Sequence, residues 1–165
     1  MDAIFTRSSV RQFEEREVEA DKLEKILRAG FAAPSALNER PWDFYVVRSK
    51  EKLLRLAEMS KYAQPLKNAP AAIVICADTS RLKNLDFVDI NCAIAAENIW
   101  LEVETLGLGC VFLAVRPFEE RAKVVADVLN LPEHVMPFGV MPLGYPKNKR
   151  PQKERFNPER VHYVD

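Results

Sequence analysis

Apolar residues recur along this chain with two different spacings, one typical of helices and one typical of strands. Between 20 and 33 they return every three or four positions, which predicts an amphipathic helix that ends before Pro34. The run 71–77 is apolar throughout, which predicts a short strand buried on both faces. The same reasoning predicts helices at 2–6, 20–33, 50–59, 86–106 and 118–129, and strands at 42–47, 71–77, 111–115 and 138–143.

The segment 86–106 gives the longest helical pattern, and it is apolar over much of its circumference. A helix of this kind is buried at the centre of a fold or in a subunit interface. After Gly144 the chain is rich in Pro, Lys and Arg and is expected to be extended. With no internal repeat and no interdomain linker, the order of elements predicts one domain over 1–165, in which helices surround a single sheet and 146–165 form an extended tail.

Composition and charge narrow the class of protein rather than its function. Apolar residues make up 48% of the chain and charged residues 29%, a balance typical of an ordered globular domain. The 24 basic and 24 acidic residues cancel, so no net charge attracts nucleic acid or a membrane surface. We therefore expect neither of those partners.

The three cysteines, Cys76, Cys92 and Cys110, lie in apolar stretches without a C-x-x-C spacing. They are expected to be reduced thiols of the core rather than disulfides or zinc ligands. The first residues lack the basic and apolar runs of a signal peptide, and no apolar stretch is long enough to span a bilayer. These features favour a cytoplasmic protein.

The sequence offers few side chains for acid, base or nucleophilic chemistry. Its two histidines have no spacing typical of a metal site or a catalytic triad. Neither nucleotide-binding motif, G-x-G-x-x-G or G-x-x-x-x-G-K-[ST], occurs. If the protein is an enzyme, a cofactor is expected to carry the chemistry.

A pattern suited to an anion is found at each end of the chain. Arg7, Ser8, Ser9 and Arg11 place two guanidinium groups and two hydroxyls in one short segment, and arginine binds phosphate oxygens in a fork-shaped geometry. Taken alone, this segment is more typical of a solvated N-terminal turn, because Arg and Ser are common surface residues. The tail is basic at Lys147, Lys149, Arg150, Lys153 and Arg155, and alone it is typical of a solvated extension.

Four segments in consecutive order resemble the motifs of the nitroreductase family. Residues 7–13 (RSSVRQF) are similar to its opening R-R-S-x-R-x-F, and 33–42 (APSALNERPW) to its A-P-S-x-x-N-x-Q-P-W. Residues 95–109 resemble its central helix and the turn and strand after it. Gly144-Tyr145-Pro146, followed by Arg155, resembles its closing segment. Together the four segments extend over nearly the whole chain.

The resemblance implies an α+β fold with a central mixed or antiparallel sheet surrounded by helices, in an intertwined homodimer with FMN at two interface sites. It implies an oxidoreductase that uses NADH or NADPH to reduce nitroaromatic, quinone or similar conjugated acceptors, with the chemistry on FMN and no catalytic side chain. The implied FMN contacts are Arg7, Ser8, Ser9, Arg11, Lys153 and Arg155 around the phosphate and pyrimidine side, Pro34, Ser35, Ala36 and Asn38 from the other subunit, and Phe112, Leu113 and Ala114 against the ring.

Two positions depart from the family pattern. Ser8 replaces the second arginine of the opening pair, and Arg40 replaces the glutamine before Pro-Trp. The connection 78–86 is short, whereas larger family members carry a helical lid there, so the flavin face is expected to be open. Other functions also fit the sequence: storage or sensing of FMN without turnover, a flavin-free interaction module that uses the basic tail, or a family relative that carries out dehalogenation or oxidative ring chemistry.

Overall fold

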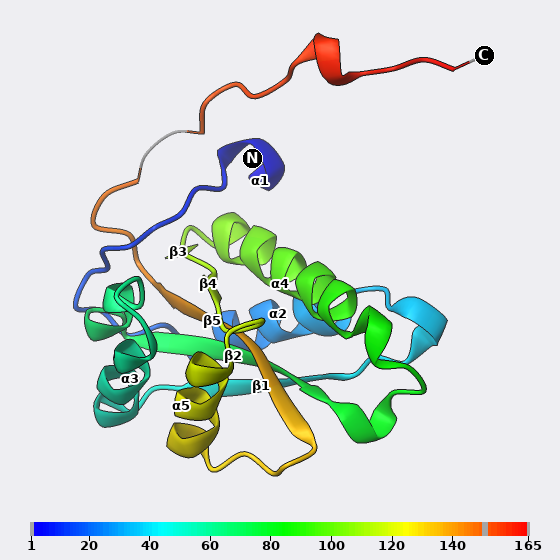
Figure 1. Ribbon diagram of the computed structural model, residues 1–165. Coiled ribbons are helices and arrows are strands. Elements are labelled where there is room, and N and C mark those ends of the chain that lie inside the picture. Colours follow the sequence, from blue (N-terminus) through cyan, green and yellow to red (C-terminus); the bar gives the residue numbers. More distant parts are fainter. Residues whose placement is uncertain (1, 150–151, 165) are drawn as a thin grey trace.

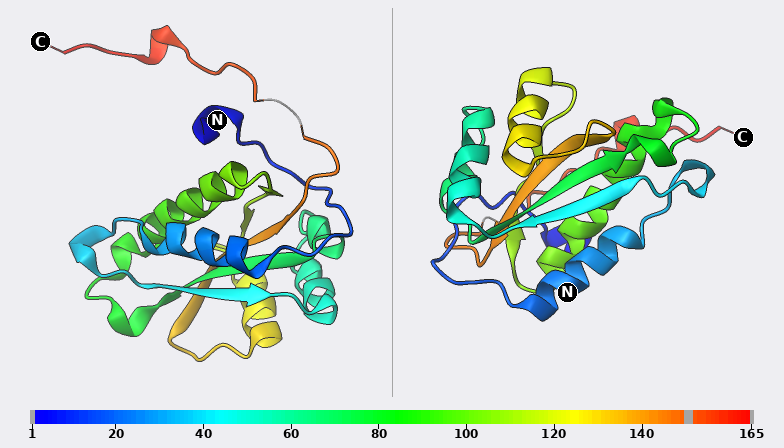
Figure 2. Two further views of the ribbon diagram at one scale, coloured as in Figure 1. Left: turned by 180° about the vertical axis from the view of Figure 1, so that it is seen from behind. Right: turned by 90° about the horizontal axis from the view of Figure 1, so that it is seen from below.

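The computed structural model describes residues 2–149 and 152–164, and its elements form three layers with a sheet between two pairs of helices (Figures 1 and 2). The strands pair in the order β1-β2-β5-β3, β4 also pairs with β5, and all pairings between these strands are antiparallel. The strands are β1 (Trp42–Val47), β2 (Ala71–Asp78), β3 (Gly109–Cys110), β4 (Leu113–Ala114) and β5 (Val135–Gly144).

Helices α2 and α4 cover one face of the sheet, and α3 and α5 cover the other (Figure 2). The α-helices are α1 (Ala3–Thr6), α2 (Ala20–Phe31), α3 (Lys50–Leu56), α4 (Val88–Thr105) and α5 (Glu119–Leu129). Short 3-10 turns connect them: η1 (Ala36–Asn38), η2 (Ala57–Met59), η3 (Gln64–Lys67), η4 (Thr79–Arg81), η5 (Leu85–Phe87) and η6 (Pro158–Arg160).

Strand β2 is buried along its whole length, as its uniformly apolar sequence predicts. Successive side chains of a strand point to opposite faces. Ile73 and Ile75 accordingly pack with α2 and α4, while Val74 and Cys76 pack with α3 and α5. The two cores of the molecule therefore meet across this one strand.

The structure confirms most of the predicted elements, with one clear correction. The strand predicted over 111–115 is wrong, because only 109–110 and 113–114 pair with β5. The interruption lies opposite Pro142, which has no backbone N–H to donate to a neighbouring strand. Val111 and Phe112 therefore do not pair with β5, and both residues line a cavity.

The three cysteines are confirmed as buried free thiols. Burial raises the pKa of each, that of Cys92 to about 12, which suits core thiols rather than reactive ones. Trp42, the first residue of β1, is also buried.

The N-terminal segment and the residues that follow β5 lie side by side, in blue and orange in Figure 1, while the C-terminal end, in red, extends away from the sheet. Ser9 forms a parallel bridge with Cys110, and the Val10 N–H donates to the Cys110 carbonyl over 3.0 Å. Farther along, Phe13 forms a bridge with Pro146. The segment 9–13 is therefore fixed between β3 and the residues that follow β5.

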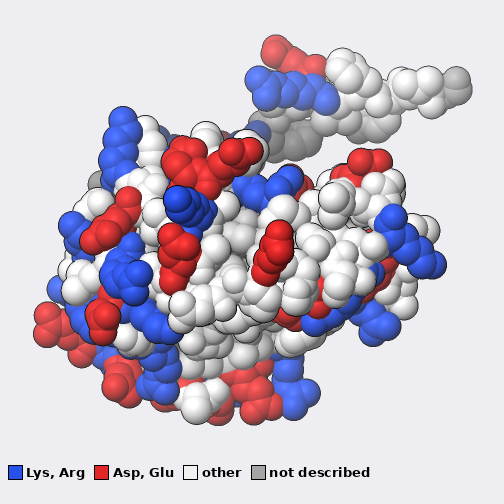
Figure 3. All heavy atoms as spheres, turned by 60° about the horizontal axis from the view of Figure 1, so that its bottom comes forward, with Lys and Arg blue, Asp and Glu red and all other residues white. Residues whose placement is uncertain are grey.

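Basic and acidic side chains are intermixed on the face shown in Figure 3, and neither sign gathers into a patch there. This distribution agrees with the balance of charge in the sequence. Within the described residues, no helix is both long enough and apolar enough to cross a membrane.

Candidate active site

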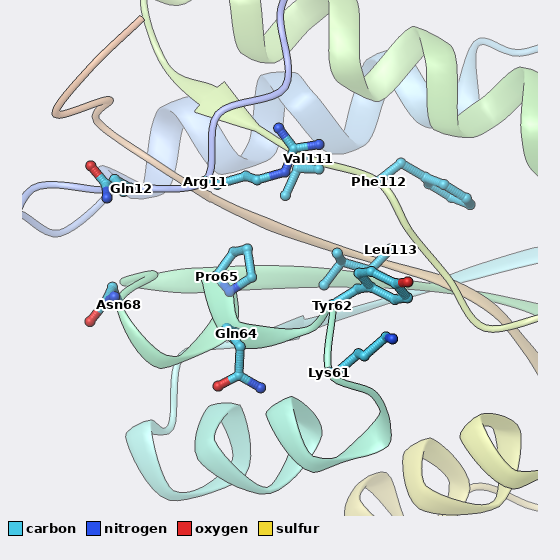
Figure 4. A pocket seen from close by; sticks show the side chains of 10 residues that line it. All are labelled: Arg11, Gln12, Lys61, Tyr62, Gln64, Pro65, Asn68, Val111, Phe112 and Leu113. Atoms are coloured by element: carbon cyan, nitrogen blue, oxygen red, sulfur yellow. The ribbon is translucent and has the colours of Figure 1, made fainter.

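A cavity of about 630 Å³ opens between the N-terminal segment, the residues that precede β2, and the break between β3 and β4 (Figure 4). Arg11 and Gln12 line it from the N-terminal segment, and Val111, Phe112 and Leu113 from the break in the strands. The third wall is the segment 61–68, which includes Lys61, Tyr62 and Asn68.

A second cavity of about 610 Å³ shares Arg11 and Gln12 with the first and adds Ser9, Asn148 and Lys149. The first cavity has an apolar wall at Val111–Leu113, while the second is lined by polar and basic groups. None of the described residues that line either cavity is acidic. The pair of cavities therefore suits an elongated ligand with a flat apolar part and an anionic end.

Arg11 is held in place by its backbone rather than by its side chain. The bridges at Ser9 and Phe13 fix the chain on both sides of it, and the Lys147 N–H donates to the Gln12 carbonyl over 3.0 Å. The Arg11 guanidinium donates only one weak bond in the described residues, to the Ser9 carbonyl at 3.3 Å. Most of its donors thus remain available to a ligand.

Arg7 lies against α4 instead of in this cavity. Its side chain is 15% exposed, its Nε is 3.7 Å from Oε1 of Glu97, and its guanidinium lies 4.2 Å from the centre of the Trp100 ring. Next to it, the buried Ser8 Oγ has no hydrogen-bond partner among the described residues. One described chain therefore does not bring Arg7 and Arg11 to the same cavity, and their shared role stays a prediction.

The loop Pro34–Asn38 lies near the start of α4, away from Arg7 (Figure 1). The Ala36 N–H donates to the buried Asn91 Oδ1 over 2.8 Å, near the start of that helix. Asn91 and Trp100 are nine residues apart, so they are separated by about 13 Å along the axis. Ser35 Oγ accepts from the Arg40 N–H at 2.9 Å and fixes a tight turn in which Leu37 and Asn38 have positive φ. Within one chain this loop does not reach Arg11.

The ring of Phe112 packs on the ring of Phe138 with 5.5 Å between centroids. Gly139 lies beneath it, because a Cβ at that position would be 2.4 Å from Phe112 Cε2. Phe112 and Leu113 line the first cavity. Ala114 pairs with Gly139 in the β4–β5 ladder and is not among the lining residues.

Lys153 and Arg155 line a separate hollow of about 430 Å³ between the tail and α1, together with Ile4, Phe5 and Phe156. The tail is tied to the N-terminal segment where Gln152 Nε2 donates to the Arg7 carbonyl at 3.3 Å. Their role at a phosphate stays a prediction. Arg150, part of the predicted basic tail, lies outside the described residues.

Sequence reasoning missed the wall formed by Lys61, Tyr62, Gln64 and Asn68. These residues lie between the predicted helix 50–59 and the predicted strand 71–77, and the sequence patterns predicted no functional role for them. The available signal was an aromatic residue in a polar connection, which by itself does not indicate a site.

A polar network ties the end of β5 to the start of α2, beside the site. The Tyr145 hydroxyl donates to the Glu19 carboxylate at 2.7 Å and accepts from Lys22 Nζ at 2.7 Å. This hydrogen bond from Tyr145, with further bonds and nearby cations, lowers the pKa of Glu19 to about 2. The network lies next to the Phe13–Pro146 bridge and therefore steadies the segment that carries Arg11.

The fold is α+β, and its cavities form a candidate ligand site between the N-terminal segment and the edge of the sheet. A sequence model described as the nitroreductase family matches residues 4–145. The chain therefore belongs to the nitroreductase family.

Individual relatives are similar over almost their full lengths. A protein of Archaeoglobus fulgidus, provisionally named NADH dehydrogenase/NAD(P)H nitroreductase, is 45% identical over 96% of this chain and 94% of its own. The crystal structure of a provisionally named NADH oxidase from Clostridium acetobutylicum superimposes with a TM-score of 0.96, at 41% identity, over 99% of both chains. An FMN-dependent nitroreductase from Clostridium difficile gives a TM-score of 0.91 at 32% identity, over 99% of this chain and 98% of its own. These similarities confirm the predicted α+β fold of the nitroreductase type.

Proposed function

We propose that this protein is an FMN-dependent oxidoreductase that uses NADH or NADPH to reduce nitroaromatic, quinone or similar conjugated acceptors. The observation that carries the proposal is the pair of cavities joined at Arg11 and Gln12, one with an apolar wall and one with basic groups. Family membership and the FMN dependence of the Clostridium difficile relative support it.

The residues present fit FMN, which combines a flat ring system with an anionic phosphate. Phe112 and Leu113 offer the apolar wall that a ring requires. Arg11 supplies a cation beside the hydroxyl of Ser9, a donor set suited to the polar and anionic part of such a ligand. Lys149 adds a second ammonium group to this lining, although it also pairs with Glu104. When bound, FMN would supply a two-electron carrier that accepts a hydride from NAD(P)H and passes it to the acceptor.

The protein's own residues would bind, orient and stabilise charge rather than react. A cation at Arg11 favours negative charge that develops near it, and it is fixed in advance by the flanking bridges. Phe112 and Leu113 exclude water from one side of the cavity. The described lining of this cavity contains no carboxylic acid or histidine, so solvent is the proposed proton source.

The proposal includes an intertwined homodimer of single-domain chains. Its support is α4, on which Ile90 is 55% exposed and Ala93, one turn farther along the same side, is also exposed. In a dimer, Pro34, Ser35, Ala36 and Asn38 would reach the FMN of the partner, while Arg7, Ser8, Lys153 and Arg155 would join the phosphate. Buried free thiols suit a reducing compartment, which supports a cytoplasmic location.

The spectrum of the purified protein tests the proposal. We expect flavin absorbance that bleaches with NADH or NADPH without oxygen and returns on addition of a quinone. Arg11→Ala should weaken FMN retention at least tenfold, because it removes a charged partner worth about 1.5–3 kcal/mol. Arg55→Ala on α3, which lines neither cavity, is the matched control.

Two results would contradict the proposal. Failure of added FMN to bind or to raise the melting temperature removes the flavin site. Bound FMN that NADH and NADPH leave oxidised indicates storage or sensing without turnover.

A further inference from the structure

The cavity next to Arg11 carries an exposed aromatic residue that the fold itself does not require. Tyr62 is 65% exposed, whereas Met59 and Ala63 beside it are buried. Ser60 holds the turn, since its hydroxyl accepts from the Tyr62 N–H at 3.3 Å and its carbonyl accepts from the Ala63 N–H at 3.0 Å. The segment is thus anchored on both sides, and a flat ring is held at the cavity where it buries little.

Lys61 adds a cation to this ring. Its Nζ lies 5.1 Å from the centre of the Tyr62 ring, and both residues line the cavity. Figure 4 shows the pair on the wall across from Arg11. No acidic residue is among the described lining residues, so Lys61 faces no opposing charge across the cavity.

We infer that Lys61 and Tyr62 form a subsite for the second ligand of the reaction and favour conjugated acceptors that carry an anionic substituent, a carboxylate or a sulfonate. This inference rests on the proposed function. With Arg11 engaged by FMN, Lys61 is the remaining cation on the described wall of this cavity. The tyrosine ring supplies a surface for stacking and the lysine an attraction for the anionic group.

The reaction itself is balanced without any group from the subsite. NAD(P)H gives up a hydride and becomes NAD(P)⁺, and the quinone takes that hydride equivalent and one proton from solvent to become the hydroquinone. Lys61 gains or loses no proton in this scheme. Its effect is on binding of the acceptor, so it should depend on the charge of the acceptor and on ionic strength.

Two acceptors that differ in one charge test the inference: naphthoquinone and naphthoquinone sulfonate. For the FMN-loaded enzyme, the ratio of kcat/KM for the sulfonate over the neutral quinone should fall about threefold in Lys61→Gln and about tenfold in Lys61→Glu, as expected for an exposed ion pair. The control is Lys123→Gln, an exposed lysine of α5 outside the cavity, which should leave the ratio at its original value.

A second measurement needs no turnover. Naphthalene sulfonate accepts no electrons, and its binding to the oxidised enzyme can be followed by the change in flavin absorbance. Its Kd should rise about threefold in Lys61→Gln, and that difference should shrink as salt is added.

The dinucleotide also carries anionic groups, so the two half-reactions are measured separately under anaerobic conditions. A loss confined to reoxidation by the sulfonate supports the inference. A loss confined to reduction by NADH or NADPH overturns it and assigns Lys61 to the donor. The subsite alone is overturned if the ratios and the Kd are unchanged in a protein that still binds FMN and is bleached by NADH. A protein that neither NADH nor NADPH reduces would remove the proposed function, and the inference with it.

Discussion

At the scale of single residues, the contacts of Tyr145 show how one hydroxyl can stabilise a site that it does not line. The Tyr145 hydroxyl forms hydrogen bonds with Glu19 and Lys22 at the start of α2. The backbone carbonyl of the same residue accepts from the Glu14 N–H at 2.9 Å. The segment 11–14 is held between these contacts and β3. The hydroxyl therefore links the position of Arg11 to the ionisation of Glu19.

The effect of Tyr145→Phe on stability should depend on pH. The folded pKa of Glu19 lies near 2, below its ordinary value of 4.5, so this carboxylate contributes its full stabilisation above pH 4.5 and loses it as the pH falls toward 2. The variant should therefore melt at a lower temperature than the natural protein at pH 7, and the gap should narrow between pH 4.5 and pH 3. Thermal unfolding followed by circular dichroism at several pH values measures it.

Tyr163→Phe provides the matched control, because Tyr163 is 90% exposed in the tail. It should leave the melting temperature unchanged at every pH. A gap for Tyr145→Phe that stays constant from pH 7 to pH 3 would show that Glu19 has no part in it.

Residue patterns pointed to only part of the candidate site, the lining of the two cavities. Arg11 and Ser9 could be found because they lie in one short motif, and Phe112 and Leu113 because they follow a recognisable turn. Lys61 and Tyr62 could not be found in this way. Their proximity to Arg11 arises from the turn at Ser60 and from burial of Ala63 and Leu66, which fold the connection back toward the N-terminal segment.

At the scale of elements, most helices and strands follow from local sequence, and the attachments between them do not. Pro34 marks the end of α2 and an apolar run defines β2. By contrast, the break between β3 and β4 depends on Pro142, which lies about 30 residues away in the sequence on the opposing strand. The attachment of segment 9–13 to β3 likewise depends on a close fit between Val10 and Gly109.

Gly109→Ala should loosen that attachment. A Cβ on Gly109 would be 2.7 Å from Cβ of Val10, and neither backbone can yield without breaking the Ser9–Cys110 bridge. We expect a loss of about 1–3 kcal/mol in the free energy of unfolding, typical of overpacking, together with weaker FMN retention because Arg11 moves. Urea unfolding and FMN titration measure the two effects.

Adding Val10→Gly to Gly109→Ala removes the opposing side chain. The double variant should recover FMN affinity relative to Gly109→Ala, even though a glycine on the N-terminal segment lowers stability by itself. If the double variant binds FMN as weakly as the single one, steric displacement of this segment is not the cause.

The end of α4 is tied to the start of the tail by a buried ion pair. The side chain of Glu104 is 3% exposed and pairs with Lys149, which also lines the second cavity. Lys149→Met leaves a buried carboxylate without its cation near a helix C-terminus, where negative charge is already unfavourable. We expect a loss of about 1–3 kcal/mol in the free energy of unfolding.

The matched double variant Glu104→Gln with Lys149→Met removes the stranded charge. Its free energy of unfolding should lie above that of Lys149→Met alone. A double variant that is less stable than either single one would contradict this account.

At the scale of the whole molecule, helix α4 lies between the parts of the proposed site that one chain keeps apart. Arg7 packs near its centre and the loop at Ala36 near its start, while its outer side carries the exposed Ile90. In the proposed dimer a second copy of the chain covers Ile90, and the loop of one protomer lies toward the cavity of the other. The sequence predicted that α4 lies either at the centre of the fold or in a subunit interface. One side of the helix packs in the core of the chain, and the other side carries the exposed Ile90 that the proposed interface would cover.

Ile90→Glu should therefore separate the proposed dimer and weaken FMN binding at the same time. A charge at a position expected to be buried between protomers costs several kcal/mol, enough to shift a dimer with micromolar dissociation toward monomers. Because Ile90 is 55% exposed in the single chain, the fold itself should be preserved. Sedimentation measures the mass, circular dichroism the fold and flavin fluorescence the bound FMN.

Leu54→Glu controls for the effect of an added surface charge. Leu54 is an apolar residue of α3 that is 42% exposed on the opposite face of the sheet, and this variant should remain dimeric and yellow. Loss of the dimer with full retention of FMN would mean that one chain holds the cofactor alone, and the contribution of Pro34–Asn38 from the partner would have to be abandoned.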